Sequence, residues 1–405
     1  MITFAIVGAC LAGATAAQTL RDEGFDGAVV LLGDEPHRPY ERPPLSKEYL
    51  QGKSPRDKVF VHPEGWYAEH DVDLRLGVTA NGIDLQARRV LTSDGASVQY
   101  DSLLLATGST PRRLALPGSE LGGVLYLRRL DDSDRIRAAF ARQPRVVVVG
   151  AGWIGLETAA AARVAGLSVT VLEHAGAPLE RILGSRMSAV FSQLHRDNGV
   201  DLRCGVSISE LTGASGHVTG VRLGDGTVIE ADLVLVGVGI SPETGLAEAA
   251  GLAVGNGITV DEHLRTSDPA VYAAGDVADA FHPLFGHRLR VEHWANARRQ
   301  GAVAARSMLG GDAVYARLPY FFTDQYDLGM EYTGYVDPAA VEDVVVRGDL
   351  PGRRFVAFWL ADGRVRAGMS VNVWDVTEAV EELITSGRRV DAALLADPGV
   401  PLPTG

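Results

Sequence analysis

Cysteine is almost absent from this sequence. Among 405 residues there are two, Cys10 and Cys204, and they lie far apart. The sequence has no Cys-x-x-C pair, so we exclude a thioredoxin-like dithiol and a cysteine-ligated metal site, and we expect no bound metal. Two isolated cysteines also favour a reducing compartment, and we predict a cytoplasmic location.

Long apolar runs and an excess of positive charge are missing as well. Although 46% of the residues are hydrophobic, no apolar run approaches 18 residues, so we expect large cores and no membrane span. The net charge of −13 argues against nucleic acid as a partner. The N-terminus lacks a basic segment and leads directly into a glycine turn, which indicates a strand and not a signal peptide. The length predicts more than one domain.

The strongest positive signal lies between residues 145 and 173. Its first strand, Val146–Val149, is too apolar for a surface strand and predicts a parallel strand covered on both faces. A second strand, residues 168–172, leads to Glu173. Between the strands an alanine-rich helix follows three glycines in G-x-G-x-x-G spacing: Gly150, Gly152 and Gly155.

This pattern predicts a dinucleotide site, because each position has a mechanical role. Gly150 permits the tight turn, Gly152 lets the backbone approach a pyrophosphate, and Gly155 lets helix and strand pack closely. The pyrophosphate sits at the helix N-terminus, where N–H groups and the dipole favour an anion. The Glu173 carboxylate can bind the ribose hydroxyls. We assign Ile154, in the same turn, to this site.

A second unit of the same kind occupies residues 4–34. Strand Phe4–Val7 leads into a glycine turn and a helix, and strand Ala28–Leu32 leads to Asp34. Cys10 replaces the middle glycine of the turn, so we expect a pyrophosphate to approach less closely there. Two dinucleotide units imply two dinucleotides, and the usual pair is FAD and NAD(P)H. The turn residues that we assign to the first dinucleotide are Gly8, Ala12 and Gly13.

The proline-rich stretch 35–53 follows the first unit. We expect a stiff loop and then a helix over Leu45–Leu50, with Pro44 at its front. Arg42 and Lys47 on this loop are well placed to meet a bound flavin. The sequence GDEPHRPYERPPLSK resembles the flavin loop of the ferredoxin reductases that serve oxygenases and cytochromes P450.

Further motifs of this family follow in order and cover essentially the whole chain. In the family, the position of Asp276 binds a ribityl hydroxyl and that of Trp294 lies against the flavin ring. The turn that contains Gly239 resembles the nicotinamide-side loop. The resemblance assigns further FAD contacts to Val78, Ala106, Thr107, Gly108, Arg128, Gly275, Asp276 and Trp294.

The resemblance implies an α/β protein with two Rossmann-like dinucleotide-binding domains, as in glutathione reductase, and a C-terminal α+β domain. From about residue 318 we expect successive antiparallel strands and a helix over Val376–Ser386. The expected domains are a discontinuous FAD-binding domain over 1–110 and 238–317, an NAD-binding domain over 111–237 and a C-terminal domain over 318–405.

The resemblance also implies an activity. An NADH-dependent ferredoxin reductase moves hydride from NADH to FAD and passes single electrons to an iron–sulfur ferredoxin, which feeds a cytochrome P450 or a ring-hydroxylating oxygenase. We place Lys47 and Glu157 at the reaction centre. A glutamate on the first turn of the nucleotide helix opposes a pyrophosphate unless a cation matches its charge, and the Lys47 amine would do so.

Three alternative activities share parts of this pattern. A rubredoxin reductase or a monodehydroascorbate reductase would have every motif and differ only in its acceptor surface. An NADH oxidase that makes water would need a cysteine beside the flavin, and the loop that carries Arg42 and Lys47 has none. An NADH-sensing flavoprotein similar to apoptosis-inducing factor would have long insertions and a basic surface, and this sequence shows neither.

Two further predictions concern specificity. Glu173 would repel the 2′-phosphate of NADPH, and residues 174–177 contain no arginine to neutralise it, so we predict a preference for NADH. Because ferredoxins of this type are usually acidic, docking on an acidic protein needs a local basic patch. We expect that patch on the helix after Trp294, at Arg298 and Arg299, with Arg288, Arg290 and Arg306 nearby.

Overall fold

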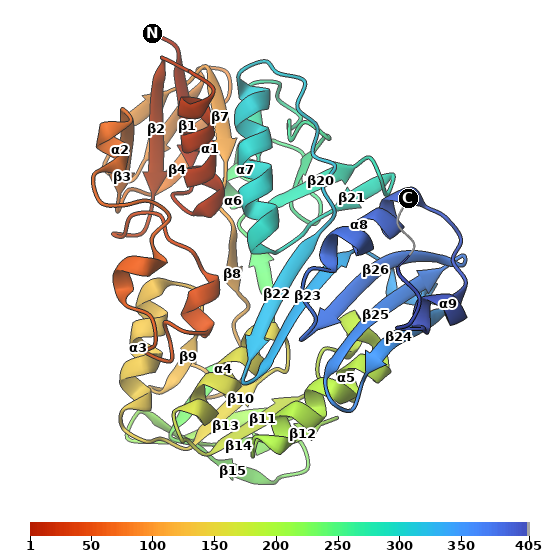
Figure 1. Cartoon of the computed structure of the whole chain (residues 1–405). Coiled ribbons are helices and arrows are strands. Elements are labelled where there is room, and N and C mark those ends of the chain that lie inside the picture. Colours follow the sequence, from red (N-terminus) through yellow and green to blue (C-terminus); the bar gives the residue numbers. More distant parts are fainter. Residues whose placement is uncertain (403–405) are drawn as a thin grey trace. The chain divides into compact units, whose positions relative to one another are not determined.

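Residues 1–402 are described by a computed structural model that divides into two compact units (Figure 1). Unit 1 comprises residues 1–41, 56–110 and 241–319. Unit 2 comprises residues 42–55, 111–240 and 320 onward. The third predicted domain thus falls in the same unit as the second, and the three-domain division stays a prediction. The connecting strands form a two-stranded sheet of β8 (Ser109–Pro111) and β17 (Ile240–Pro242).

A five-stranded parallel sheet forms the core of unit 1. Its central strand β1 pairs with a strand on either side, so that Val7 lies beside both Leu32 and Leu105. These strands are apolar along their whole length because both faces of the sheet are covered. In spatial order the strands are β19 (Val271–Ala273), β7 (Ser102–Leu105), β1 (Thr3–Val7), β2 (Ala28–Gly33) and β3 (Val72–Leu76).

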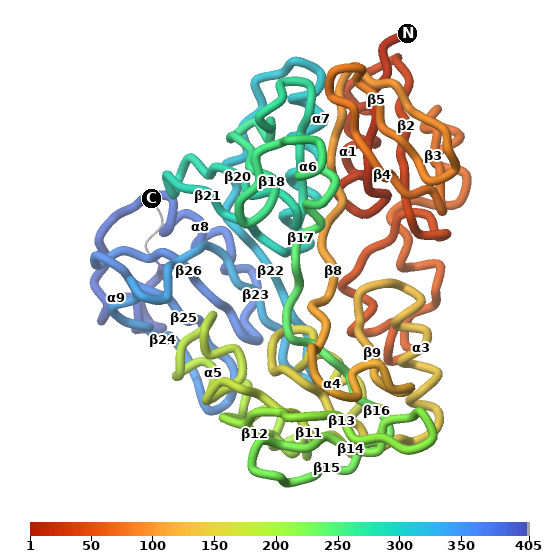
Figure 2. Tube along the Cα trace, turned by 180° about the vertical axis from the view of Figure 1, so that it is seen from behind, coloured from red at the N-terminus to blue at the C-terminus, as the bar shows by residue number. Residues whose placement is uncertain are grey.

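Two helices, α1 (Leu11–Asp22) and α7 (Trp294–Met308), lie side by side in this unit (Figure 1). Their backbones approach closely, because a Cβ at Gly301 would lie 2.4 Å from the Ala12 carbonyl oxygen. The unit also contains a sheet of β18, β20 and β21, which Figure 2 shows from behind. Its remaining strands and α-helices are β4 (Ala80–Asp84), β5 (Arg89–Thr92), β6 (Ser97–Gln99), β18 (Ile258–Val260), β20 (Ala278–His282), β21 (His287–Leu289), α2 (Trp66–Glu69) and α6 (Gly245–Ala249).

Unit 2 contains a second five-stranded parallel sheet. The strand Val146–Val149 is central and fully buried, as its composition predicts. The two sheets confirm the predicted α/β class. In spatial order the strands are β12 (Asp201–Cys204), β11 (Val169–Glu173), β10 (Val146–Val149), β16 (Leu233–Val236) and β9 (Val124–Tyr126), and the helices of this part are α3 (Leu130–Phe140), α4 (Trp153–Val164) and α5 (Glu180–Asp197).

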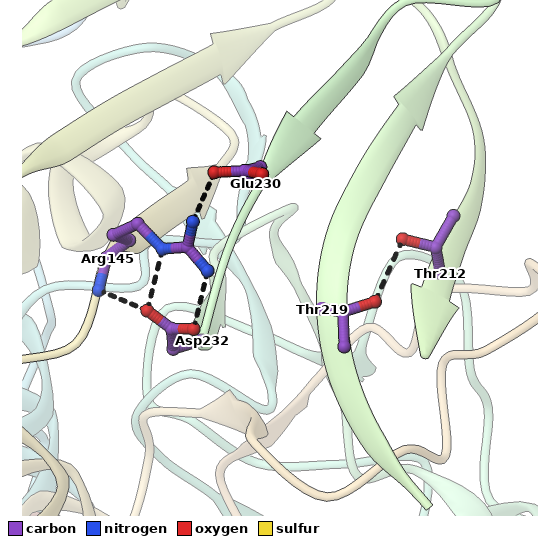
Figure 3. A network of polar contacts seen from close by, with 5 residues as sticks. All are labelled: Arg145, Thr212, Thr219, Glu230 and Asp232. Carbon is purple, nitrogen blue, oxygen red and sulfur yellow. Dashed lines mark hydrogen bonds and ion pairs between the residues drawn. The ribbon is translucent and has the colours of Figure 1, made fainter. Parts of the chain in front are cut away.

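A small antiparallel sheet is attached to this part of unit 2, and Figure 3 shows its polar contacts. Arg145, just before β10, forms an ion pair with Asp232 at 2.8 Å and another with Glu230. Across the hairpin the hydroxyls of Thr212 and Thr219 lie 3.4 Å apart. The strands are β13 (Ile208–Ala214), β14 (His217–Leu223) and β15 (Val228–Glu230).

The C-terminal segment forms an antiparallel sheet that shares its hydrophobic core with α4 and α5. The Trp153 ring on α4 lies 5.0 Å from the Phe321 ring and 5.5 Å from the Phe191 ring, measured between centroids. In spatial order the strands are β22 (Tyr320–Gln325), β23 (Leu328–Gly334), β26 (Arg364–Val371), β25 (Arg354–Ala361) and β24 (Asp343–Asp349), accompanied by α8 (Thr377–Ser386) and α9 (Ala392–Ala396).

Two local predictions are wrong. The helix expected over Leu45–Leu50 is a short 3₁₀ helix over Pro43–Ser46, because Lys47 leaves the helical region with φ −118° and ψ −120°. Glu157 lies in the second turn of α4 and not in the first, since the helix begins at Trp153. Its carboxylate is therefore not stabilised by the helix N-terminus, and its charge requires another partner.

Two further features are absent from the part of the chain that the structure describes. No helix within residues 1–402 is long and apolar enough to cross a membrane. Across the same residues, no three His, Cys, Asp or Glu side chains gather closely enough to hold a metal ion.

The Arg145–Asp232 contact predicts a pH-dependent contribution to stability. Hydrogen bonds from Arg145 lower the pKa of Asp232 to about 2. A carboxyl group whose pKa is lowered on folding stabilises the protein above its unfolded pKa of about 4, and the contribution is lost as the pH falls towards 2. Because both side chains are about half exposed, we expect Asp232→Asn to reduce the free energy of unfolding at pH 7 by only about 1 kcal/mol.

Urea unfolding at pH 7 tests this expectation. The control is Asp201→Asn, which removes a carboxylate from a two-residue surface pair with Arg203 at 2.8 Å and should change stability by less than about 0.5 kcal/mol. An equal loss of unfolding free energy in the two variants would contradict the stabilising contribution assigned to the Arg145–Asp232 contact.

Candidate functional site

The glycine turn of unit 2 contains two glycines that the fold itself requires. Gly150 has φ +97°, and a Cβ there would lie 2.4 Å from the Gly237 carbonyl oxygen. A Cβ at Gly155 would lie 2.0 Å from the Gly150 carbonyl oxygen. Both approaches involve backbone atoms, so a larger residue at either position would displace the turn.

Gly152 differs from these two glycines. A Cβ at Gly152 would have no atom within 4 Å, and its φ of −78° suits any residue. Packing within the chain therefore does not explain this glycine. It precedes α4 and provides no side-chain cap, so the N–H groups of the first turn are available to a ligand. A closely approaching anion such as a pyrophosphate fits both observations.

Glu173 ends β11 beside this turn. Its Oε2 accepts a hydrogen bond from the Ala151 N–H at 2.6 Å, and its Oε1 accepts one from the Ala175 N–H at 2.8 Å. A carboxylate has about four acceptor positions, so the two backbone bonds orient the group and leave positions for ribose hydroxyls. Ile154, in the first turn of α4, is 44% exposed. These residues fit a bound dinucleotide.

Gly239 lies in the turn that follows β16. It has φ +101°, a conformation that favours glycine, and its carbonyl oxygen accepts a hydrogen bond from the Arg112 N–H at 2.9 Å. Its predicted role beside a nicotinamide stays a prediction.

The glycine turn of unit 1 is built in the same way. Gly8 has φ +119°, and a Cβ there would lie 2.1 Å from the Ala106 carbonyl oxygen. A Cβ at Gly13 would lie 2.1 Å from the Gly8 carbonyl oxygen. Cys10 takes the Ncap position of α1 without a side-chain cap. The exposed Asp34 directly follows β2, as the dinucleotide pattern requires.

The Gly-Asp motif reaches this turn from a distant part of the sequence. A Cβ at Gly275 would lie 3.4 Å from the Cβ of Ala12, so the two motifs lie close together. The Ser109 hydroxyl donates a hydrogen bond to Asp276 Oδ2 at 2.8 Å. Gln300 on α7 accepts a hydrogen bond from the Gly275 N–H at 2.8 Å. The fold thus brings the two predicted flavin motifs together.

Several other predicted FAD contacts lie within unit 1. The Val78 N–H donates to the Gly33 carbonyl at 2.9 Å, which places Val78 at the end of β2. The Thr107 hydroxyl donates to the Glu243 carbonyl at 2.8 Å, and Gly108 follows it. Trp294 is the first residue of α7. Their contact with a flavin stays a prediction.

Unit 2 contains the remaining predicted flavin residues. The Arg42 guanidinium donates a hydrogen bond to the Arg128 carbonyl, so two candidates that are distant in sequence meet. The 3₁₀ helix that follows Arg42 directs Lys47 into the interior, where it is 7% exposed.

Lys47 and Glu157 form a buried ion pair. The Lys47 Nζ lies 2.8 Å from Glu157 Oε1, and Glu157 is 3% exposed. The Ser46 hydroxyl donates to Oε2, and the Thr323 hydroxyl donates to Oε1 at 2.6 Å. A buried charge is tolerated when it is paired and its remaining lone pairs are satisfied. The sequence predicted the pairing of lysine and glutamate, and the structure contains it.

Thr323 is a residue that sequence reasoning missed. It lies on β22, 166 positions from Glu157, and belongs to no motif. The only available signal was a polar residue at an inward-facing position of an aromatic-rich strand, which by itself does not identify a partner.

Neither cysteine lies on the loop, helix or strand that carries this pair. Cys10 is half-buried at the start of α1 in unit 1. Cys204 ends β12, where burial raises the pKa of its thiol and so disfavours the reactive thiolate. The buried polar groups beside Lys47 provide an amine, a carboxylate and two hydroxyls, which suit binding and orientation and not thiol chemistry.

Comparison with known proteins agrees with this geometry. Residues 2–301 match the pyridine nucleotide-disulphide oxidoreductase family, and residues 320–404 match the reductase C-terminal family. The chain is 40% identical over 402 residues to the anthranilate 1,2-dioxygenase system ferredoxin–NAD(+) reductase component of Burkholderia cepacia, covering 99% of this chain and 98% of that protein.

Two solved structures are also very similar. The putidaredoxin reductase–putidaredoxin complex contains a chain with TM-score 0.95 and 37% identity, covering 99% of this chain and 97% of that one. The ferredoxin reductase for the CYP199A2 system from Rhodopseudomonas palustris has the same TM-score and identity, and covers 99% of both chains. The chain belongs to the pyridine nucleotide-disulphide oxidoreductase family, within its group of ferredoxin reductases with a reductase C-terminal domain.

Proposed function

We propose that this protein is an NADH-dependent ferredoxin reductase of an oxygenase or cytochrome P450 system. In this reading unit 1 binds FAD, and the glycine turn of unit 2 binds NADH. When bound, FAD would supply an acceptor for hydride from NADH and a one-electron donor to an iron–sulfur ferredoxin. The protein binds and orients the two dinucleotides. A cytoplasmic location remains part of the proposal, from the two isolated cysteines.

One observation carries the choice of activity within the family. Relatives that reduce disulfides or peroxide need a cysteine beside the flavin, and the loop after the first nucleotide unit here places Lys47 in a buried pair with Glu157. An amine held in this way cannot form a disulfide or a thiol–flavin adduct. Electron transfer to an external one-electron acceptor needs neither.

The direct test measures acceptor dependence. NADH-driven reduction of cytochrome c should be slow with the FAD-bound protein alone and should rise strongly when a ferredoxin of an oxygenase system is added. Full turnover without ferredoxin, or reduction of a disulfide substrate, would contradict the proposed function.

For the docking surface we propose a narrower patch centred on Arg298. This side chain is exposed, and its guanidinium carbon lies 5.7 Å from the centre of the Trp294 ring. Three other cations of the expected patch are already bound within the unit: Arg290 by Glu292, Arg299 by the Leu318 carbonyl and Arg306 by Glu23.

The first of three predictions for this function separates ligand binding from folding at the glycine turn. Gly152→Ala places a methyl group where the chain itself leaves open space, so it should leave the unfolding temperature nearly unchanged and weaken NADH at least about tenfold. Gly155→Ala is the matched variant, and its backbone clash should cost about 1–3 kcal/mol of stability. NADH titrations and thermal unfolding of both variants check this. Unchanged NADH affinity in Gly152→Ala would place the nucleotide elsewhere.

The second prediction concerns cofactor choice. Glu173→Ala removes both the acceptor for ribose hydroxyls and the charge that repels a 2′-phosphate. We expect kcat/KM for NADH to fall about tenfold and kcat/KM for NADPH to fall less, so that the ratio between the two cofactors becomes smaller. Glu210→Ala on β13, which removes a carboxylate paired with Arg222 at 2.6 Å, is the control. Equal kcat/KM for the two cofactors in the unmutated protein would refute the assignment.

The third prediction concerns ferredoxin docking. Arg298→Glu should raise the KM for ferredoxin several-fold and flatten its dependence on salt, because the charge acts on encounter. Reduction of ferricyanide should hardly change, since it reports only the hydride half-reaction. Arg135→Glu, at a 70% exposed position on α3, controls for net charge. An equal rise in KM in both variants would mean that net charge, and not a patch at Arg298, controls docking.

A further inference from the structure

The Lys47–Glu157 pair is the end of a longer buried hydrogen-bonded chain. Gln325 Nε2 lies 3.1 Å from Thr323 Oγ1, which is bonded to Glu157. His195 Nε2 lies 2.8 Å from Gln325 Oε1. Thr323, Gln325 and His195 are each at most 1% exposed. This hydrogen-bonded chain connects α4, β22 and α5, all within unit 2.

The chemistry of the groups fixes the direction of every bond in this chain. A carboxylate paired with an ammonium only accepts, so the single Thr323 hydroxyl proton points to Glu157. The Thr323 oxygen therefore accepts from the Gln325 amide nitrogen, which turns the Gln325 oxygen towards His195. That oxygen can only accept, so His195 must carry its proton on Nε2.

The far end of the chain is consistent with this direction. The Tyr326 hydroxyl lies 3.4 Å from His195 Nδ1, the nitrogen that remains an acceptor in this tautomer. Burial lowers the pKa of His195 to about 4, so the ring stays neutral near pH 7. Successive hydrogen bonds with the same direction polarise one another, and here each donor points towards Glu157.

We propose that Thr323 is a positioning residue for the Lys47–Glu157 pair, and that Gln325 and His195 orient its hydroxyl. Ser46 holds one oxygen of the Glu157 carboxylate, and Thr323 holds the oxygen that also binds Lys47. The carboxylate is thereby fixed from two sides, and Lys47 with it. The C-terminal segment, through β22, thus sets the geometry of the pair that we place at the reaction centre, an inference that rests on the proposed function.

The need to fill the hydrophobic core does not explain why the residues of this hydrogen-bonded chain are polar. Thr323 and Gln325 occupy inward-facing positions of β22, where apolar residues would fill the core without burying polar groups. Apolar residues at those positions would leave the Glu157 oxygen with one donor fewer. The polar residues are explained when the Glu157 carboxylate has to be held in one orientation.

Stopped-flow reduction of the FAD-bound protein by NADH tests the proposal. Thr323→Val keeps the shape and removes the hydroxyl, and should lower the limiting rate of flavin reduction about tenfold, as expected for one hydrogen bond to a charged group. The NADH concentration for half-saturation should stay within about twofold, because the nucleotide turn is untouched. Thr323→Ser restores the hydroxyl and should recover most of the rate.

The matched control is Thr333→Val on the neighbouring strand β23. Thr333 is similarly buried, at 2% exposure, and its hydroxyl donates to Glu381 Oε1 at 3.5 Å. This variant should reduce flavin at the unmutated rate. An unmutated rate in Thr323→Val, or the same loss in Thr323→Ser, would overturn the proposal.

A second measurement does not depend on turnover. Nitrogen NMR of histidine-labelled protein, with the His195 signals assigned by their loss in His195→Asn, should show a neutral ring protonated at Nε2. Gln325→Leu should abolish this preference. A proton on Nδ1 in the unmutated protein would overturn the direction of the chain. If NADH fails to reduce the unmutated protein the proposed function is wrong, and the NMR result still decides whether the oriented chain exists.

Discussion

The burial of one carboxylate, Glu157, constrains much of unit 2. Glu157 is 3% exposed, and burying a carboxylate is costly unless its charge is paired and its lone pairs are hydrogen-bonded. Lys47 matches the charge, and Ser46 and Thr323 satisfy the oxygens. The proline-rich loop, the nucleotide helix α4 and the C-terminal strand β22 are therefore held by the same group.

This arrangement explains why the C-terminal segment packs as part of unit 2. The Trp153 and Phe321 rings provide the apolar contact between α4 and β22, and the bond from Thr323 to Glu157 provides the polar one. A shared core gives non-directional stability, whereas a buried hydrogen bond fixes orientation. We place the Lys47 amine at the reaction centre as a proposal, and a role there would need fixed orientation as well as stability.

In the two glycine turns, some positions of the motif are required by backbone packing and one position is not. Gly150 and Gly155 are needed by the backbone, as are Gly8 and Gly13 in unit 1, because a Cβ would meet a carbonyl oxygen. A Cβ at Gly152 would meet no atom of the chain, so packing does not require a glycine there, and we assign this position to ligand binding. Where the first unit has Cys10 instead, the turn still forms, which shows that the middle position does not serve the fold.

The sequence alone determined the two parallel sheets, their glycine turns and the acids that follow them, because strand apolarity and glycine spacing are local properties. It also predicted the pairing of Lys47 with Glu157, since an unmatched carboxylate near a pyrophosphate is unfavourable. It misplaced the helix after Pro44, because burial of Lys47 in the ion pair outweighs local helix propensity. Only the tertiary structure decided that Thr323, Gln325 and His195 extend the pair. Such contacts join residues more than a hundred positions apart, and no local pattern encodes which buried polar groups will meet.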